Sequence, residues 1–296
     1  MRVFITGATG FIGTVVVQEL IRAGHQVLGL TRSDAGAKAL TGAGAQVHRG
    51  DLEDLESLRA GAALSDGVIH TAFVHDFSKF KENSQIDRRA IEAIGQVLAG
   101  SERPLVVTSG TLLVKPGHLA TEDMPVPNDS SMPRVSEQTA LSLIPSGVRA
   151  SIVRLPQVHD RDKAGLVSFL IAAAREKGVS AYIGEGQNRW SAVHRLDVAP
   201  VYRLALEKAP AGATYHAVGE EGVPLRDIAE AIGRGLKLPV VSKSGDAATK
   251  HFGVLTTFAA IDGPASSALT QQRLGWRPTQ PTGLIADLDQ FNEFRA

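Results

Sequence analysis

The stretch Arg2-Val3-Phe4-Ile5-Thr6-Gly7-Ala8-Thr9-Gly10-Phe11-Ile12-Gly13 decides the fold of this 296-residue chain. Three apolar residues between two polar ones predict a buried strand, and the glycines then lead into apolar residues at helical spacing. Gly7 would permit a sharp turn, Gly10 a close approach of a ligand to the backbone, and Gly13 close packing of the helix on the sheet. Strand, glycine turn and helix in this order predict a dinucleotide-binding site, because the free amides of the helix face an anion. An ordinary strand-to-helix turn is the alternative reading of the same glycines.

Composition limits the class of protein and of partner. The chain has 43% hydrophobic and 21% charged residues, and 31 Lys plus Arg balance 31 Asp plus Glu. We expect a globular protein of one large or two unequal domains, and the zero net charge argues against nucleic acid or an anionic membrane as a partner. The absence of cysteine excludes disulfides, thiolate metal sites and cysteine nucleophiles. We predict no metal site. Because the first strand starts at Arg2 and no apolar run approaches membrane-spanning length, a cytoplasmic location is expected.

Predicted strands and helices alternate through the first half of the chain. The expected strands are 2–6, 26–30, 45–52, 67–70, 104–108 and 149–155, and the expected helices include 55–62, a long one through 86–97, and 136–144. This alternation predicts an α/β fold, a Rossmann-type doubly wound parallel sheet with its ligand at the carboxyl ends of the strands. We expect a NAD(P)-binding domain over residues 1–155 and a smaller, mainly substrate-side domain over 156–296. Parts of 188–217 are expected to return to the first domain.

The second half of the chain has less regular spacing. Helices are expected at 165–177, 196–208, 225–236 and 284–294, with strands at 181–183 and 214–217. The proline-rich and glycine-rich stretch 112–133 is expected to be a loop over the site.

The end of the second strand decides which dinucleotide is bound. It reads Thr31-Arg32-Ser33, and an arginine there accommodates a ribose 2′-phosphate, whereas an acidic residue holds the 2′-hydroxyl. A guanidinium makes paired charged hydrogen bonds to phosphate, so the sequence favours NADP. Asp34, which lies further along, leaves NAD as an alternative, and Arg32 could instead be a solvated surface charge.

Residues at the other strand ends complete the predicted cofactor site. Asp51 and Leu52 are expected near the adenine, and Thr71 to Phe73 near the linking ribose and phosphate, although an ordinary strand-end turn is the alternative for each. The full predicted cofactor set is Gly7, Thr9, Gly10, Phe11, Ile12, Gly13, Thr31, Arg32, Ser33, Asp51, Leu52, Thr71, Ala72, Phe73, Thr108, Leu155 and Pro156.

Two hydroxyl groups after the fifth strand are candidates for catalysis. Ser109 and Thr111 lie at the same predicted sheet edge as the glycine turn. A hydroxyl there can polarise a carbonyl, or it can bond its own backbone.

Three further residues are candidates for substrate contact. Arg189 could meet an anionic group and Trp190 a flat one, although Trp190 could instead pack at a domain junction. His159 is the third candidate, on the ground that it follows a predicted strand end.

The chain resembles the extended short-chain dehydrogenase/reductase superfamily, which includes the NAD-dependent epimerases and dehydratases. The matching segments are Thr6 to Gly13, Asp51-Leu52, Thr108-Ser109, the run from 184 to 199, and Leu274-Gly275-Trp276 with Pro278. The resemblance spans nearly the whole chain and implies the Rossmann fold and a bound nicotinamide nucleotide. Helices flanking Arg88 and Ser136 are where relatives often dimerise, so a homodimer is compatible with it.

The resemblance also implies a catalytic tyrosine followed four residues later by a lysine. The nearby cation lowers the pKa of the phenol, which otherwise titrates near pH 10. The chain has only Tyr182, Tyr202 and Tyr215, and none has a lysine four residues on. At the place where relatives carry the pair, this chain reads Pro133-Arg134-Val135-Ser136-Glu137, which identifies it as an atypical member.

These observations leave three hypotheses open. The first is an NADP-dependent oxidoreductase acting on a small carbonyl or alcohol, in which Ser109 bonds the carbonyl oxygen, Thr111 assists, and water, His159 or His118 supplies the proton. The second is a non-catalytic NADP(H)-binding sensor or scaffold, because loss of the proton couple would cost about a hundredfold to ten-thousandfold in rate. A sugar-nucleotide epimerase or dehydratase is the third hypothesis, and the absent tyrosine weakens it most.

Overall fold

The computed structural model describes residues 1–127 and 133–294, which form two compact units. Unit 1 contains Met1–Ser109, residues 133–154 and Val198–Tyr215. Unit 2 contains Gly110–Pro127, Leu155–Asp197 and residues 216–294. Each unit is therefore assembled from three separate segments of chain. The segment 198–215 belongs to unit 1, and the segment 110–127 belongs to unit 2.

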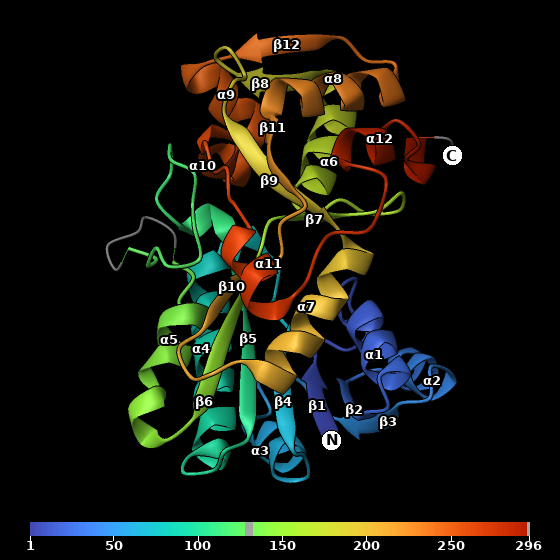
Figure 1. Ribbon diagram of the computed structural model, residues 1–296. Helices are drawn as coiled ribbons and strands as arrows, with labels where there is room; N and C mark the ends of the chain where they lie inside the picture. Colours follow the sequence, from blue (N-terminus) through green and yellow to red (C-terminus); the bar gives the residue numbers. More distant parts are fainter. Residues whose placement is uncertain (128–132, 295–296) are drawn as a thin grey trace. The chain divides into compact units, whose positions relative to one another are not determined.

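Unit 1 is built on the predicted Rossmann sheet (Figure 1). The strand order is β10-β6-β5-β4-β1-β2-β3, and β1 pairs in parallel with both β2 and β4. The chain order therefore reverses between β1 and β4, which is the switch point where such sheets bind their ligand. This confirms the predicted fold class. The strands are β1 Arg2–Thr6, β2 Gln26–Thr31, β3 Gln46–Arg49, β4 Gly67–His70, β5 Pro104–Gly110, β6 Arg149–Leu155 and β10 Thr214–His216.

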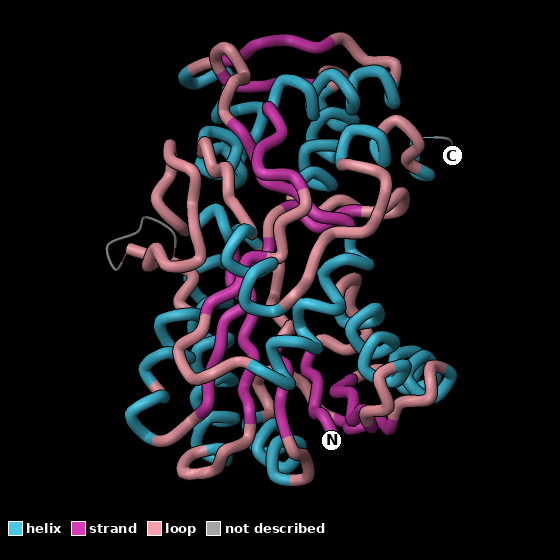
Figure 2. Tube along the Cα trace, in the orientation of Figure 1, coloured by secondary structure: helices cyan, strands magenta, loops and turns pink. Residues whose placement is uncertain are grey.

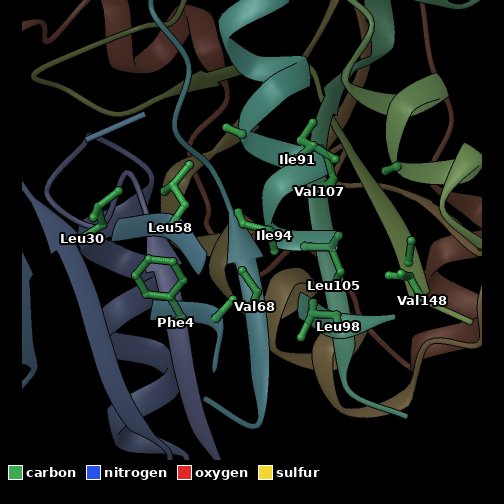
Figure 3. Close-up of a cluster of buried hydrophobic side chains, with 14 of the residues drawn as sticks. Phe4, Leu30, Leu58, Val68, Ile91, Ile94, Leu98, Leu105, Val107 and Val148 are labelled. Atoms are coloured by element: carbon green, nitrogen blue, oxygen red, sulfur yellow. The ribbon is translucent and has the colours of Figure 1, made fainter. Parts of the chain in front are cut away.

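Three helices cover one face of this sheet: α3 (Leu55–Ala63), α4 (Phe80–Leu98) and α5 (Ser136–Ser142). Ile91, Ile94 and Leu98 of α4 recur at helical spacing and are fully buried against Phe4 and Val107 of the strands (Figure 3). This apolar stripe explains why the segment forms a long helix on the sheet.

The remaining helices of unit 1 are α1 (Gly13–Arg22), α2 (Asp34–Gly42) and α7 (Arg195–Lys208). An ion pair of 2.7 Å between Arg203 Nε and Glu19 Oε1 joins α7 to α1. Tyr202 of α7 is fully buried and its phenol is 2.6 Å from Thr108 Oγ1 of β5. The helix α7 is thus tied to the sheet at the end of β5.

Unit 2 contains two small sheets with helices around them, which Figure 2 shows by type of element. One sheet has the order β11-β9-β7, with β9 parallel to β7 and antiparallel to β11; the other pairs β12 with β8 in parallel. Its strands are β7 Gln157–His159, β8 Ser180–Ile183, β9 Arg189–His194, β11 Glu220–Pro224 and β12 Val240–Lys243. Its helices are α6 Val167–Lys177, α8 Leu225–Leu236, α9 Gly245–Phe252, α10 Thr256–Ala260, α11 Ala268–Leu274 and α12 Leu284–Leu288.

Short 3₁₀ turns complete the described chain: η1 Phe77–Lys79, η2 Thr111–Leu113, η3 Ile144–Ser146, η4 Gly253–Leu255 and η5 Asn292–Phe294. The predicted helix over 284–294 is therefore wrong in its extent, since α12 ends at Leu288. The amide of Asn292 bonds to the carbonyl of Arg161 at 2.8 Å, which draws the chain out of a continuous helix. No helix in the described residues has both the length and the apolar character needed to cross a membrane.

Candidate active site at the carboxyl ends of β1, β4 and β5

The glycine turn after β1 is tight enough to exclude side chains at two positions. Gly7 has φ of +71°, and a Cβ there would lie 2.8 Å from the amide nitrogen of Ala72. At Gly13 a Cβ would lie 2.0 Å from the carbonyl oxygen of Gly7. Gly10 differs, because it is exposed and its Cβ would meet only Gly7 O, at 3.1 Å. Gly7 and Gly13 thus hold the turn together, whereas Gly10 leaves open space beside it.

The start of α1 is suited to an anion. No side chain caps this ten-residue helix, and its first turn holds no acidic residue. Thr9 and Gly10 before it are exposed, while Phe11 and Ile12 are half-buried. An uncapped helix start beside an open glycine is the arrangement that accepts a diphosphate, because amide groups and the helix dipole point to the same place. The residues present therefore fit a dinucleotide.

The end of β2 presents an arginine with no ion-pair partner in the part of the chain that the structure describes. Arg32 is exposed, and no side chain among the described residues pairs with it. The carboxylate of Asp34 is already paired, since Arg49 Nη2 lies 2.5 Å from its Oδ1. Ser33 caps α2 by accepting a hydrogen bond of 3.0 Å from Gly36 N, and Thr31 is buried. Arg32 is thus the unpaired charge at the predicted ribose position.

The predicted adenine-side residues have local structural roles. Asp51 Oδ1 accepts hydrogen bonds from the amides of Glu53 at 2.8 Å and Asp54 at 3.2 Å. These bonds shape the turn that leads into α3. Leu52 is half-buried and packs against the hydrophobic core of unit 1. Both residues lie at the carboxyl end of β3, where the sequence places them.

The segment after β4 is bonded to the end of β1. Thr71 Oγ1 donates to Thr6 O at 2.8 Å, and the amide of Ala72 lies 3.4 Å from Thr6 Oγ1. Phe73 follows, half-buried, with the guanidinium carbon of Arg134 4.3 Å from its ring centroid. These contacts fix the backbone beside the glycine turn at the switch point of the sheet.

The end of β5 carries a buried hydroxyl that lacks a partner. Ser109 is 2% exposed, and no described group is within hydrogen-bonding distance of its Oγ. Its neighbour Thr108 is satisfied, because Thr108 Oγ1 donates to His70 O at 2.8 Å and lies near the Tyr202 phenol. Burial raises the pKa of Tyr202, so that phenol stays protonated. Buried polar groups are normally hydrogen-bonded, so the unsatisfied Ser109 hydroxyl is suited to a ligand oxygen.

Thr111, Leu155 and Pro156 belong to unit 2. Thr111 is buried and its Oγ1 lies 3.1 Å from Ser191 Oγ and 3.4 Å from Leu155 O. Leu155 is half-buried and Pro156 is buried. The hydroxyl of Thr111 thus already has partners inside its own unit, unlike that of Ser109.

A buried chain of polar side chains crosses the carboxyl ends of β1 and β4. Thr6 Oγ1 lies 2.8 Å from His70 Nδ1, and His70 Nε2 lies 2.9 Å from Asp87 Oδ1. On the other oxygen of Asp87, Ser136 Oγ donates at 2.5 Å. Ser136 Oγ in turn accepts from Arg134 Nε at 3.0 Å. The network joins β1, β4, α4 and the segment before α5.

Sequence reasoning missed this network, although one signal for it exists. Asp87 lies one helical turn before Ile91 on the buried stripe of α4 and is 1% exposed. A carboxylate on an apolar helix face needs a buried partner, because an unpaired buried charge is very costly. That partner is His70, at the end of the neighbouring strand.

Glu137 forms a buried ion pair with Arg154 of β6. Arg154 Nε donates to Oε2 at 2.9 Å and Arg154 Nη2 to Oε1 at 2.6 Å, and the two side chains are 1% and 5% exposed. This bidentate pair uses both oxygens of the carboxylate. Glu137, which stands at the position expected for the lysine of relatives, therefore serves to hold α5 on β6.

The predicted substrate residues all lie in unit 2. Arg189 pairs with Asp262, with Nε 3.0 Å from Oδ1 and Nη2 2.9 Å from Oδ2, so its charge is met within the unit. Trp190 is 1% exposed and its Nε1 has no described partner.

His159 and His118 differ in burial. His159 is 1% exposed, with Nδ1 2.8 Å from Asp287 Oδ2, and burial lowers its pKa although the hydrogen bond with Asp287 opposes this. His118 is exposed and its Nδ1 is 3.4 Å from Pro116 O.

Comparison with known proteins places these features in context. Residues 3–218 match the model of the NAD dependent epimerase/dehydratase family. The chain is 53% identical over 290 residues to the uncharacterized protein C2A9.02 of Schizosaccharomyces pombe, covering 97% of this chain and 98% of that protein. It is 28% identical over 242 residues to a decarboxylating sterol-4-alpha-carboxylate 3-dehydrogenase of Dictyostelium discoideum, covering 76% of this chain and 73% of that one.

Among solved structures, the UDP-glucose 4-epimerase of Thermotoga maritima with UDP-glucose has a TM-score of 0.75 at 18% identity. The match covers 100% of this chain and 98% of the epimerase. At this identity the likeness concerns the fold.

Proposed function

This chain belongs to the NAD dependent epimerase/dehydratase family, and from that premise we propose that it is an NADP-dependent oxidoreductase acting on a small carbonyl or alcohol. The observation that carries the proposal is the unsatisfied, buried hydroxyl of Ser109 at the end of β5. It lies at the edge of the sheet that also bears the glycine turn. The dehydrogenase similarity of the Dictyostelium relative supports the same class of reaction.

The preference for NADP rests on Arg32. Its guanidinium is exposed and unpaired among described residues, and Asp34 is occupied by Arg49. The carboxylate that could have held a 2′-hydroxyl forms a surface ion pair with Arg49, and the exposed guanidinium of Arg32 is the group that would bind a 2′-phosphate.

Each group at the site has a separate task. The bound nicotinamide would supply or accept the hydride. The glycine turn and the amides of α1 would hold the diphosphate, and Arg32 the extra phosphate. Ser109 would hydrogen-bond the substrate oxygen and orient the carbonyl, and positioning of this kind accounts for a large part of catalysis.

The test is nucleotide binding followed by turnover. Calorimetry on the purified chain should give tighter binding of NADPH and NADP⁺ than of NADH and NAD⁺. NADPH oxidation is then followed against a panel of ketones, aldehydes and imines. Binding without turnover on a broad panel would argue against the enzyme, and absence of binding would refute the proposal as a whole.

A matched pair of serine variants tests the role of Ser109. Ser151 on β6 is also 2% exposed, and its hydroxyl has no partner among the described residues, but it is the third residue of its strand, whereas Ser109 is the last but one of β5. Ser109→Ala should keep NADPH affinity and lose turnover, whereas Ser151→Ala should keep both. Equal loss in the two variants would contradict a role for Ser109.

A non-catalytic NADP(H) sensor is the second candidate. The observation that favours it is the engagement of Glu137 by Arg154, since no ammonium group occupies that position to activate a phenol. A sensor would bind NADPH and change its protease sensitivity or partner binding, without turnover of any carbonyl in the panel.

A further inference from the structure

Arg134 lies at the end of β5 and is held there from three sides. Its Nη2 donates to the carbonyl of Thr108 at 3.2 Å, and its Nε donates to Ser136 Oγ at 3.0 Å. Its guanidinium carbon lies 4.3 Å from the centroid of the Phe73 ring. These contacts fix the plane of the guanidinium, because the two hydrogen bonds and the ring face each restrict it.

The guanidinium retains donor capacity. It carries five N–H groups, of which the contacts above use two, and its hydrogen bonds to described residues are those of Nε and Nη2. The side chain is half-buried. Desolvation lowers the pKa of Arg134 and the Asp87 carboxylate opposes this, yet an arginine stays charged at neutral pH. A fixed cation with unused donors therefore lies beside the end of β5.

Ser109 is next in sequence to Thr108, whose carbonyl Arg134 contacts. Its buried Oγ has no described partner. One strand end thus bears an unsatisfied hydroxyl, and a rigid guanidinium with free N–H groups is bonded to the residue before it. Both groups can donate a hydrogen bond to an oxygen atom.

We propose that Arg134 binds the substrate oxygen together with Ser109, in the role that the tyrosine has in related enzymes as a donor to that oxygen. This inference rests on the proposed oxidoreductase function. It specifies the substrate as a compound whose reacting oxygen takes up negative charge during the reaction, a ketone or aldehyde and not an imine.

The chemistry of the two donors decides how the charge on the substrate oxygen is stabilised and where its proton comes from. As the carbonyl carbon gains a hydride, the π electron pair moves to oxygen, and the N–H of Arg134 and O–H of Ser109 stabilise the charge. Arginine does not release its proton near neutral pH, so the oxygen is protonated by solvent water. The rate should consequently lack the titration near pH 10 or below that a catalytic phenol gives.

The buried network keeps the guanidinium in place. Ser136 accepts from Arg134 and donates to Asp87, whose other oxygen bonds to His70. The Asp87 carboxylate thus offsets part of the buried positive charge, and Arg134 retains its remaining donors for a ligand.

The experiment measures binding of a carboxylate probe, which presents charged oxygens without reacting. Benzoate is titrated by calorimetry into the wild-type chain saturated with NADP⁺. Arg134→Met should weaken benzoate binding about tenfold to a hundredfold, the range for loss of a charged hydrogen bond. NADP⁺ affinity should stay unchanged, which also shows that the variant folds.

Two further variants complete the test. In Arg134→Ala, added methylguanidinium should restore benzoate binding, because it refills the space with the same donors. Arg59→Met removes an arginine of α3 that pairs with Glu56 and should leave benzoate binding unchanged. Absence of benzoate binding by the wild type, or equal binding by Arg134→Met, would overturn the proposal.

The result also separates this inference from the proposed function. Turnover of a ketone by the wild type, with unchanged kcat/KM in Arg134→Met, would refute the role of Arg134 and leave the oxidoreductase in place. Loss of benzoate binding in Arg134→Met without turnover of any substrate would support the oxygen site and refute the oxidoreductase.

Discussion

The buried ion pair of Glu137 and Arg154 yields a prediction that separates structure from catalysis. The side chains are 5% and 1% exposed and are joined by two hydrogen bonds. Removing one partner leaves an uncompensated buried charge, which costs about 3–5 kcal/mol. Replacing both by apolar residues removes both charges and should leave the free energy of unfolding close to that of the wild type or higher.

Urea unfolding of four proteins measures these free energies: wild type, Glu137→Leu, Arg154→Met and the double variant. Each single variant should lose about 3–5 kcal/mol, equivalent to a fall in Tm of about 6–20 °C at about 2–4 °C per kcal/mol. The double variant should recover most of this loss. As a control, Glu92→Leu removes the half-exposed partner of Arg88 and should cost about 0.5 kcal/mol or less.

The prediction is wrong if Glu137→Leu keeps its stability to within about 1 kcal/mol, since the cost of breaking a buried ion pair would then not apply to this one. It also fails if the double variant is as unstable as the sum of the single ones, because the two residues would then act independently. If Glu137→Leu stays stable and loses only turnover, Glu137 is a functional carboxylate.

Three further predictions concern the glycine turn, Arg32 and His159. Gly13→Ala should destabilise the chain and abolish NADPH binding, because its Cβ would lie 2.0 Å from Gly7 O. Gly10→Ala should fold normally, as measured by circular dichroism and thermal melting, but calorimetry should show weaker NADPH binding. Arg32→Gln should weaken NADPH binding by about tenfold to a hundredfold and leave NADH binding unchanged, and an equal effect on both would contradict the 2′-phosphate assignment. Burial lowers the pKa of His159 below the ordinary value of 6.5, so as pH falls through that value the unfolded chain takes up a proton first and stability is lost. Urea unfolding at pH 7.5 and 5.5 should therefore show a smaller acid loss in His159→Gln than in the wild type, and an equal or larger loss would contradict it.

The sheet of unit 1 could be predicted because its signals are local. Its strands β1, β2, β4, β5 and β6 are short, mainly apolar runs, and the glycines after β1 identify the point where the chain leaves the sheet. The spacing of Ile86, Ala90, Ile91, Ile94 and Val97 likewise predicts a helix through 86–97, and the observed α4 begins earlier, at Phe80. The topology then follows from the alternation of strands and helices.

The small strands of unit 2 could not be predicted in the same way. Arg189 and Trp190 were expected to contact substrate, and both belong to a strand, β9, that the sequence did not predict. Strand β9 pairs with β7 and with β11, and β11 lies beyond α7 in the chain. Such short strands depend on partners far away in sequence, so their own residues carry little of the signal.

The residues of the candidate site could be predicted where their place at a strand end decides their position. They could not be predicted where hydrogen bonds between side chains decide it. Ser109 and Arg32 follow from their place at strand ends. The bonds of Arg134 to Thr108 and Ser136, and of Asp87 to His70, depend on which rotamers pack together, and spacing does not encode this. Whether the predicted cofactor and substrate residues contact ligands stays a prediction.

The edge position of β10 has a consequence for synthesis of the chain. This strand, Thr214–His216, is the neighbour of β6, Arg149–Leu155, and completes the sheet of unit 1. At a translation rate of about 5–20 residues per second, the ribosome needs about 3–12 seconds to add the roughly 60 residues between them. During that interval the nascent chain carries β6 as an open edge able to pair with another polypeptide, so chaperone binding should concentrate in this window.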